Sequence, residues 1–201
     1  GHASIADLGH VIICFENISE LAAIRLEDEP LWDGQAKSSR YQNFASGGWF
    51  VPDSIRGSET EGTYYGILRS LAEIYRLLHQ PVTEFLSKRE PCPQSMKQAD
   101  YQRTIDARAF DVTRYLLPLA ARTNVGQVVS IRTLEKQITR LLSSQLPELR
   151  AIGDELKDSC QRSPINLWGE LCGQSAGAHE PLAPTLARHA KSNDYQTSVY
   201  Q

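Results

Sequence analysis

The sequence lacks a long apolar run, a closely spaced cysteine pair and an excess of basic charge. No run approaches the roughly 18–20 apolar residues of a membrane span, so we predict no membrane insertion. The net charge of −3 provides no basic excess to drive counterion release, so we expect no binding to nucleic acid. Without a Cys-x-x-Cys pair we predict no zinc or redox site and a reduced, cytoplasmic setting. The four scattered cysteines are Cys14, Cys92, Cys160 and Cys172.

The length and composition fit one globular domain that spans residues 1–201. The hydrophobic fraction of 41% and the charged fraction of 22% are ordinary for such a domain. The sequence opens at Gly1 without a methionine. We therefore expect that the chain lacks its N-terminal segment or is one half of a tandem.

The N-terminal third predicts a strand followed by a helix. Residues 11–15 are a β-branched and aromatic run typical of a buried strand, and Cys14 within it is expected to be a buried small hydrophobe. Asn17 and Glu20 have the spacing of a capping box, which predicts the start of a helix. Pro30 ends this helix, since proline disfavours helical geometry in the residue before it.

Further along, apolar spacing, caps and prolines predict several long helices. A helix over about 60–79 is expected to end because of Pro81, and a turn is expected at Asn124-Val125-Gly126. With a small sheet, these elements predict an α+β fold of long helices packed on a small, mostly antiparallel sheet. The other predicted helices cover residues 100–113, 130–143 and 147–160, and Ser130 is the expected N-cap of the second of these.

The predicted helix over 130–143 carries two different faces. Arg132, Lys136 and Arg140 are spaced by four residues, so their cations share one face without an acidic side chain in the row. Two interpretations remain open: a solvated basic face, or a site for phosphate or carboxylate groups. The apolar face consists of Ile131, Leu134, Ile138, Leu141 and Leu142.

Two segments carry motifs in a defined order. The first, GHASIADLGHVIICFENISELAAIRLEDEPLWDGQAKSSRY, contains a Gly-His-x-Ser turn, then a predicted strand and helix, and a polar loop that closes on Arg-Tyr. The second, RYLLPLAARTNVGQVVSIRTLEKQITRLLSSQLPELR, contains an Arg-x-x-Leu-Pro-Leu segment and the arginine-bearing helix that follows. In their order and spacing the two segments together resemble the flavin-dependent thymidylate synthases, which methylate dUMP. The resemblance implies a fold like that of these synthases.

The resemblance implies specific roles for residues in both segments. The cofactor FAD is expected to contact His2, Ser4, Arg132 and Lys136. The nucleotide is expected to contact Ser38, Arg40, Arg114 and Arg140. Arg140 matches its family position only with one residue deleted, and it is the expected catalytic residue because a cation there favours an anionic pyrimidine.

One position departs from the family pattern. Where the signature Arg-His-Arg is expected, seven residues before Ser38, the chain has Asp28-Glu29-Pro30. Two carboxylates facing a phosphate in a partly dry site would cost several kcal/mol.

The resemblance implies a homotetrameric enzyme. It would convert dUMP, or a related pyrimidine nucleotide, to its 5-methyl product with methylenetetrahydrofolate and NADPH, and FAD would carry the redox chemistry. Two alternatives remain open. In the first, the chain is a non-catalytic homologue that serves as a structural subunit. In the second, it is a nucleotide sensor that binds no flavin.

Overall fold

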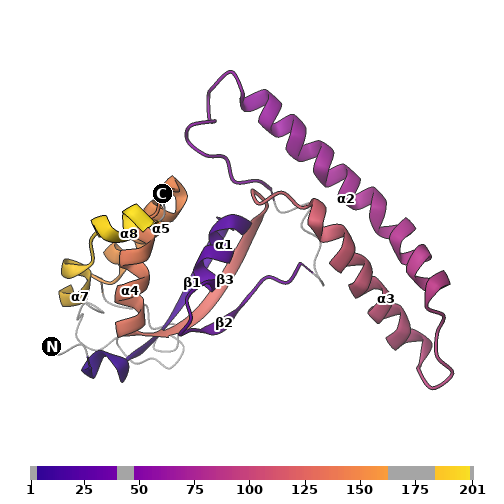
Figure 1. The fold of residues 1–201 in the computed structure, drawn as a ribbon, viewed down its shortest axis with the longest axis horizontal. Coiled ribbons are helices and arrows are strands. Elements are labelled where there is room, and N and C mark those ends of the chain that lie inside the picture. The colour runs from indigo at the N-terminus through magenta and orange to yellow at the C-terminus, as the bar shows by residue number, and fades with distance from the viewer. Residues whose placement is uncertain (1–3, 40–47, 163–183, 200–201) are drawn as a thin grey trace, which may run out of the picture. The chain divides into compact units, whose positions relative to one another are not determined.

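The computed structural model describes residues 4–39, 48–162 and 184–199. It is an α+β fold with a small three-stranded antiparallel sheet in the order β1-β3-β2, as the sequence predicts (Figure 1). The strands are β1 (His10–Ser19), β2 (Asp33–Ala36) and β3 (Arg122–Ser130). The helices are η1 (Ile5–Asp7), α1 (Glu20–Glu27), α2 (Glu61–Arg89), α3 (Gln98–Thr113), η2 (Arg114–Leu116), α4 (Ile131–Leu142), α5 (Pro147–Ser159), α7 (Pro184–His189) and α8 (Asp194–Val199).

The chain divides into two compact units, and each is described by itself. Unit 1 comprises Gly1–Ile13, Leu26–Gly34 and Gln127–Gln201, and unit 2 comprises Cys14–Arg25 and Gln35–Gly126. The prediction of one domain over residues 1–201 stays a prediction. None of the helices in the described ranges combines the length and apolar character needed to cross a membrane.

Strand β3 lies at the centre of the sheet and runs through the turn predicted at Asn124-Val125-Gly126. That prediction is wrong. Burial alternates along the strand, with Val125, Gln127 and Val129 buried. This period of two continues through the Asn and Gly positions, and pairing with strands on both sides outweighs their local preference for a turn.

The start of α1 differs from the prediction by two residues. Ser19, not Asn17, caps the helix, since Ser19 Oγ accepts a hydrogen bond of 3.0 Å from the amide of Ala22. Asn17 belongs to β1, has a positive φ of 58° and donates its amide to Asn124 Oδ1 at 2.8 Å. Cys14 is exposed, so the expectation of a buried thiol is also wrong.

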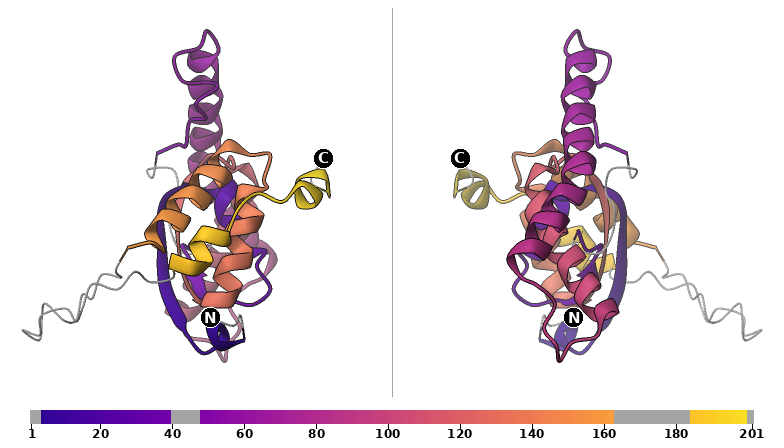
Figure 2. Two further views of the ribbon diagram at one scale, coloured as in Figure 1. Left: turned by 90° about the vertical axis from the view of Figure 1, so that its left-hand side faces the viewer. Right: turned by 90° about the vertical axis from the view of Figure 1, so that its right-hand side faces the viewer.

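Within unit 2, α2 and α3 form a pair of adjacent helices (Figure 1). Pro81 does not end α2, which continues to Arg89 as one helix and lies in front in the right-hand view of Figure 2. A proline inside a helix costs about 3 kcal/mol or more, and the packing of the following turns on α3 offsets this cost. That contact buries Leu86, Tyr101, Ile105 and Ala109, with Val82 and Cys92 at its edge.

An ion pair fixes the far end of the same helix pair. Arg108 donates two hydrogen bonds to the carboxylate of Glu90, the residue that follows α2. The hydrogen bonds from Arg108 hold the pKa of Glu90 below its usual value. Tyr101 adds a hydrogen bond of 2.8 Å from its hydroxyl to the Glu90 carbonyl. The loop between α2 and α3 is therefore held at its first residue.

In unit 1, α4 and α5 begin where the sequence predicts. Ser130 caps α4, with Oγ accepting a hydrogen bond of 3.1 Å from the amide of Thr133. Pro147 occupies the first turn of α5, where its missing N–H costs nothing. The two helices pack so closely that a Cβ on Gly153 would lie 3.0 Å from Leu141 Cβ.

Two buried amides join β3 to α4 inside unit 1. Gln127 and Gln137 are 1% and 0% exposed. Each donates to the other, with Nε2 to Oε1 distances of 2.6 and 3.2 Å. A buried amide without a partner is costly, so this reciprocal pair fixes how the helix sits on its strand.

We expect the Gln137→Leu variant to lose about 1–3 kcal/mol in the free energy of unfolding, because the Gln127 amide is left buried without a partner. The Gln127→Leu/Gln137→Leu variant should recover part of this loss. Urea unfolding followed by circular dichroism measures both. A double variant less stable than the single one would contradict this account of the pair.

Candidate functional site

The basic face of α4 lies against the N-terminal turn of unit 1. Arg132 Nη1 contacts Asp7 Oδ2 at 2.7 Å, and Asp7 belongs to η1, which packs on α4. The amide of Ile131 donates to the carbonyl of Gly9 at 2.9 Å. A Cβ on Gly9 would meet Ile131 Cδ1 at 2.6 Å, so a side chain at this position would require the end of the Ile131 side chain to move. The turn that begins at Ser4 is thus brought to the first turn of α4.

Two cations near this turn are available to an anionic ligand. The side chains of Arg132 and Asp7 are 43% and 47% exposed. An ion pair that is exposed to this extent has little net strength in water. Lys136, one turn further on, is exposed and makes no ion pair or hydrogen bond with any residue that the structure describes. These cations and the Ser4 turn fit the diphosphate of FAD in charge.

The third cation of the row has a buried partner. Arg140 Nη2 lies 3.5 Å from Glu29 Oε2, and the two side chains are 22% and 8% exposed. Glu29 follows the end of α1, and its amide donates to the carbonyl of Leu26 at 3.2 Å. The sequence did not predict this contact, although the carboxylates at Asp28-Glu29-Pro30 were the available signal.

Three consecutive acidic residues, Glu27, Asp28 and Glu29, lie at the end of α1. Burial, and secondly the neighbouring Asp28, raise the pKa of the Glu27 carboxyl above its usual value. The carbonyl of Glu27 accepts a hydrogen bond of 3.2 Å from Trp32 Nε1. Carboxylates thus dominate the position where the resemblance leads one to expect cations.

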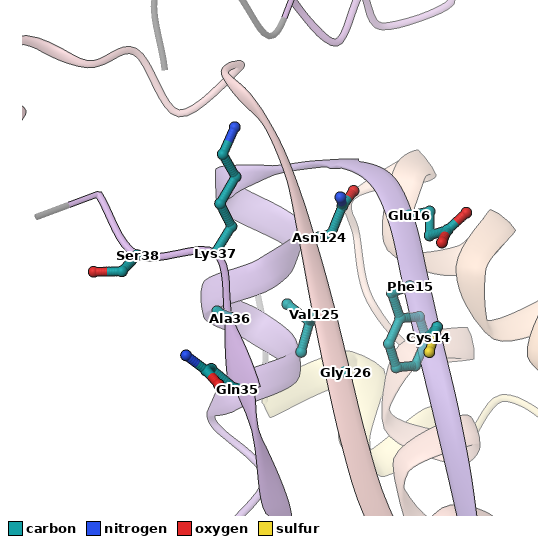
Figure 3. A pocket seen from close by; sticks show the side chains of 10 residues that line it. All are labelled: Cys14, Phe15, Glu16, Gln35, Ala36, Lys37, Ser38, Asn124, Val125 and Gly126. Carbon is teal, nitrogen blue, oxygen red and sulfur yellow. The ribbon is translucent and has the colours of Figure 1, made fainter. Parts of the chain in front are cut away.

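Unit 2 contains an open groove of about 640 Å³ along its part of the sheet (Figure 3). Ser38, one of the predicted nucleotide contacts, lines it. Gly126 leaves room at its floor, since a Cβ there would come no nearer than 4.0 Å to the Gln35 carbonyl. In Figure 3, Gln35 and Ser38 point to one side and Glu16 points to the other, so these polar groups do not converge. The remaining lining residues are Cys14, Phe15, Ala36, Lys37, Asn124 and Val125.

Arg114 begins η2 at the end of α3 and does not line this groove. Its Nη2 lies 3.3 Å from Asp111 Oδ1, and its guanidinium lies 5.9 Å from the centre of the Tyr115 ring. The Arg114 side chain is 39% exposed, so it remains reachable for a ligand.

The remaining predicted contacts, His2 and Arg40, lie outside the described residues. The assignment of Arg40, Arg114 and Arg140 to one nucleotide stays a prediction, because Arg114 belongs to unit 2 and Arg140 to unit 1. Within the described ranges, no group of three or more His, Cys, Asp or Glu side chains is arranged to hold a metal ion.

A model of the thymidylate synthase complementing protein family matches residues 1–163. The chain belongs to this family. The match covers most of the chain and includes every residue assigned above to a ligand. The family resemblance stated from the sequence is therefore confirmed.

Two curated relatives differ from this chain in length and sequence. A UPF0159 protein of Chlamydia pneumoniae is 29% identical over 161 residues, which are 77% of this chain and 30% of that protein. One from Chlamydia muridarum is 30% identical over 161 residues, with the same coverage. This chain therefore spans about a third of the length of these curated relatives.

Solved structures share the fold. Thymidylate synthase X from Helicobacter pylori, solved with FAD and dUMP, has a TM-score of 0.52 at 18% identity and covers 94% of this chain and 77% of its own. The UMP/dUMP methylase PolB from Streptomyces cacaoi, bound with 5-Br dUMP, has a TM-score of 0.54 at 14% identity, with 93% and 73% covered. At these identities the likeness establishes the fold.

The exposure of two cysteines provides a test of the groove in unit 2. Cys14 is exposed at the groove, whereas burial raises the pKa of the Cys160 thiol and leaves less thiolate at a given pH. We expect iodoacetamide at pH 8 to label Cys14 well before Cys160, as measured by peptide mass spectrometry. Equal labelling rates under native conditions would contradict the placement of Cys14.

Proposed function

We propose that this chain is one domain of an FAD-dependent thymidylate synthase. The reaction converts dUMP, or a related pyrimidine nucleotide, to its 5-methyl product. Methylenetetrahydrofolate donates the carbon unit and NADPH the reducing equivalents, so the other products are tetrahydrofolate and NADP⁺. A cytoplasmic homotetramer is the expected assembly.

The observation that carries this proposal is the extent of the family match. It runs from residue 1 to residue 163 and so includes both segments that hold the predicted ligand contacts. The ligands named for the two solved structures, FAD with dUMP and 5-Br dUMP, support the same classes of cofactor and substrate here.

Each unit would contact a different ligand. In unit 1, Ser4, Arg132 and Lys136, together with His2, would hold the anionic groups of FAD, and Arg132 would exchange Asp7 for a phosphate. In unit 2, Ser38 and Arg114, together with Arg40, would hold the nucleotide. FAD, when bound, would supply the redox chemistry, while the protein orients the reactants.

The cations missing at Asp28-Glu29-Pro30 would come from outside this chain. The curated relatives are about three times as long as the part that this chain matches. The family resemblance also implies sites that are shared between subunits. A second domain or subunit could therefore provide the arginines that bind the phosphate.

The second candidate is a non-catalytic homologue that serves as a structural or nucleotide-binding subunit. The contact between Glu29 and Arg140 favours it, because a buried carboxylate already occupies one predicted substrate contact. In this case the fold persists as a scaffold beside an active domain.

Two measurements on the full-length protein separate these candidates. The first is its visible absorption spectrum, where oxidised flavin is expected. The second is formation of dTMP from dUMP with methylenetetrahydrofolate and NADPH, supported by complementation of a thymidine auxotroph. A protein that contains no flavin even after FAD is added would contradict the proposal that the chain belongs to an FAD-dependent enzyme. Binding of dUMP to the flavin-free protein in calorimetry, without turnover, would identify a nucleotide-binding subunit.

We expect the Arg114→Ala variant to weaken dUMP binding by about 1.5–3 kcal/mol, the contribution of a hydrogen bond to a charged group. Isothermal titration calorimetry measures the change. Arg103→Ala is the matched control, since Arg103 lies in the preceding helix α3, is 81% exposed and pairs with Asp100 of the same helix. An unchanged affinity in Arg114→Ala would remove Arg114 from the nucleotide site.

A further inference from the structure

The pairs made by Arg132 and Arg140 on α4 differ in their access to water. The Arg132–Asp7 pair is nearly half exposed on both sides. In the Arg140–Glu29 pair the carboxylate side chain is only 8% exposed and the guanidinium 22%. Solvent can replace Asp7 at Arg132 at little cost, but Glu29 has little access to water that could replace Arg140.

This difference determines which arginine accepts an external anion. An incoming phosphate at Arg140 would leave the Glu29 carboxylate buried and without its cation. It would also place two negative groups side by side in a site of low dielectric constant. Both effects oppose binding, and both are weaker at Arg132, because water reaches the Asp7 carboxylate there.

We infer that Glu29 is a specificity-determining residue that occupies the Arg140 guanidinium in place of an anionic ligand. Glu29 excludes phosphate and carboxylate groups from this end of α4, while Arg132 and Lys136 remain open to them. Arg140 in this chain is thus a structural partner of Glu29 rather than a contact of the nucleotide. The inference explains why the proposed nucleotide site leaves out Arg140, which the family resemblance assigns to it. It rests on the proposed function for the choice of dUMP as a probe.

The Glu29→Gln variant tests the inference, with inorganic phosphate and dUMP as separate probes. Glutamine keeps the size of the side chain and removes its charge. We expect phosphate affinity to rise by about tenfold or more, because a charge-assisted hydrogen bond becomes available at Arg140. The Glu29→Gln/Arg140→Ala variant should lose this gain, and Asp28→Asn, which removes an adjacent exposed carboxylate, should not show it. Equal phosphate affinity in wild type and Glu29→Gln would overturn the inference.

A measurement on the wild-type protein covers the case in which Glu29→Gln does not fold. Phenylglyoxal modifies accessible arginines, and mass spectrometry follows each site. We expect saturating dUMP to leave the labelling rate of Arg140 unchanged. Protection of Arg140 by dUMP would overturn the inference. The two probes also distinguish failure of the proposed function from failure of this inference. A wild-type protein that does not bind dUMP would contradict the proposed function, whereas the change in phosphate affinity of Glu29→Gln tests the role of Glu29 alone.

Discussion

The placement of helix α4 on strand β3 is the constraint on which the cation row of unit 1 depends. The strand passes into the helix without a loop, Ser130 caps the junction, and the buried amides of Gln127 and Gln137 bond to each other. A polar pair with no access to water has one satisfactory arrangement, so the rotation of α4 is fixed. That rotation buries the apolar stripe and presents Arg132, Lys136 and Arg140 together.

A row of like charges on a helix is unfavourable unless anions neutralise it, and the chain supplies two of its own. Asp7 meets Arg132 near the surface, and Glu29 meets Arg140 where little water reaches. The same type of ion pair therefore has two consequences. An exposed pair exchanges readily with a ligand, whereas a buried pair competes with it.

The fold could be predicted from the sequence where local signals agree. The cap at Ser130, the proline at the start of α5 and the period of the apolar residues predict α4 and α5 correctly. Local signals failed where long-range packing opposed them. Pro81 lies within α2 because the next turns pack on α3, and Asn124-Val125-Gly126 lies within β3 because strands pair on both sides. The cap predicted at Asn17 was wrong for the same reason, since Asn17 bonds to Asn124. Cys14 is exposed on β1, which is an edge strand of the sheet.

The family, the α+β class and the order of the cations on α4 follow from the amino-acid sequence, because motif order and helical period are properties of the chain alone. Which of these cations already has a partner depends on how the chain folds. Asp7 lies 125 residues from Arg132 along the chain, and Glu29 is similarly remote from Arg140. No local pattern encodes such contacts, since they form only when β3 and α4 bring distant segments together.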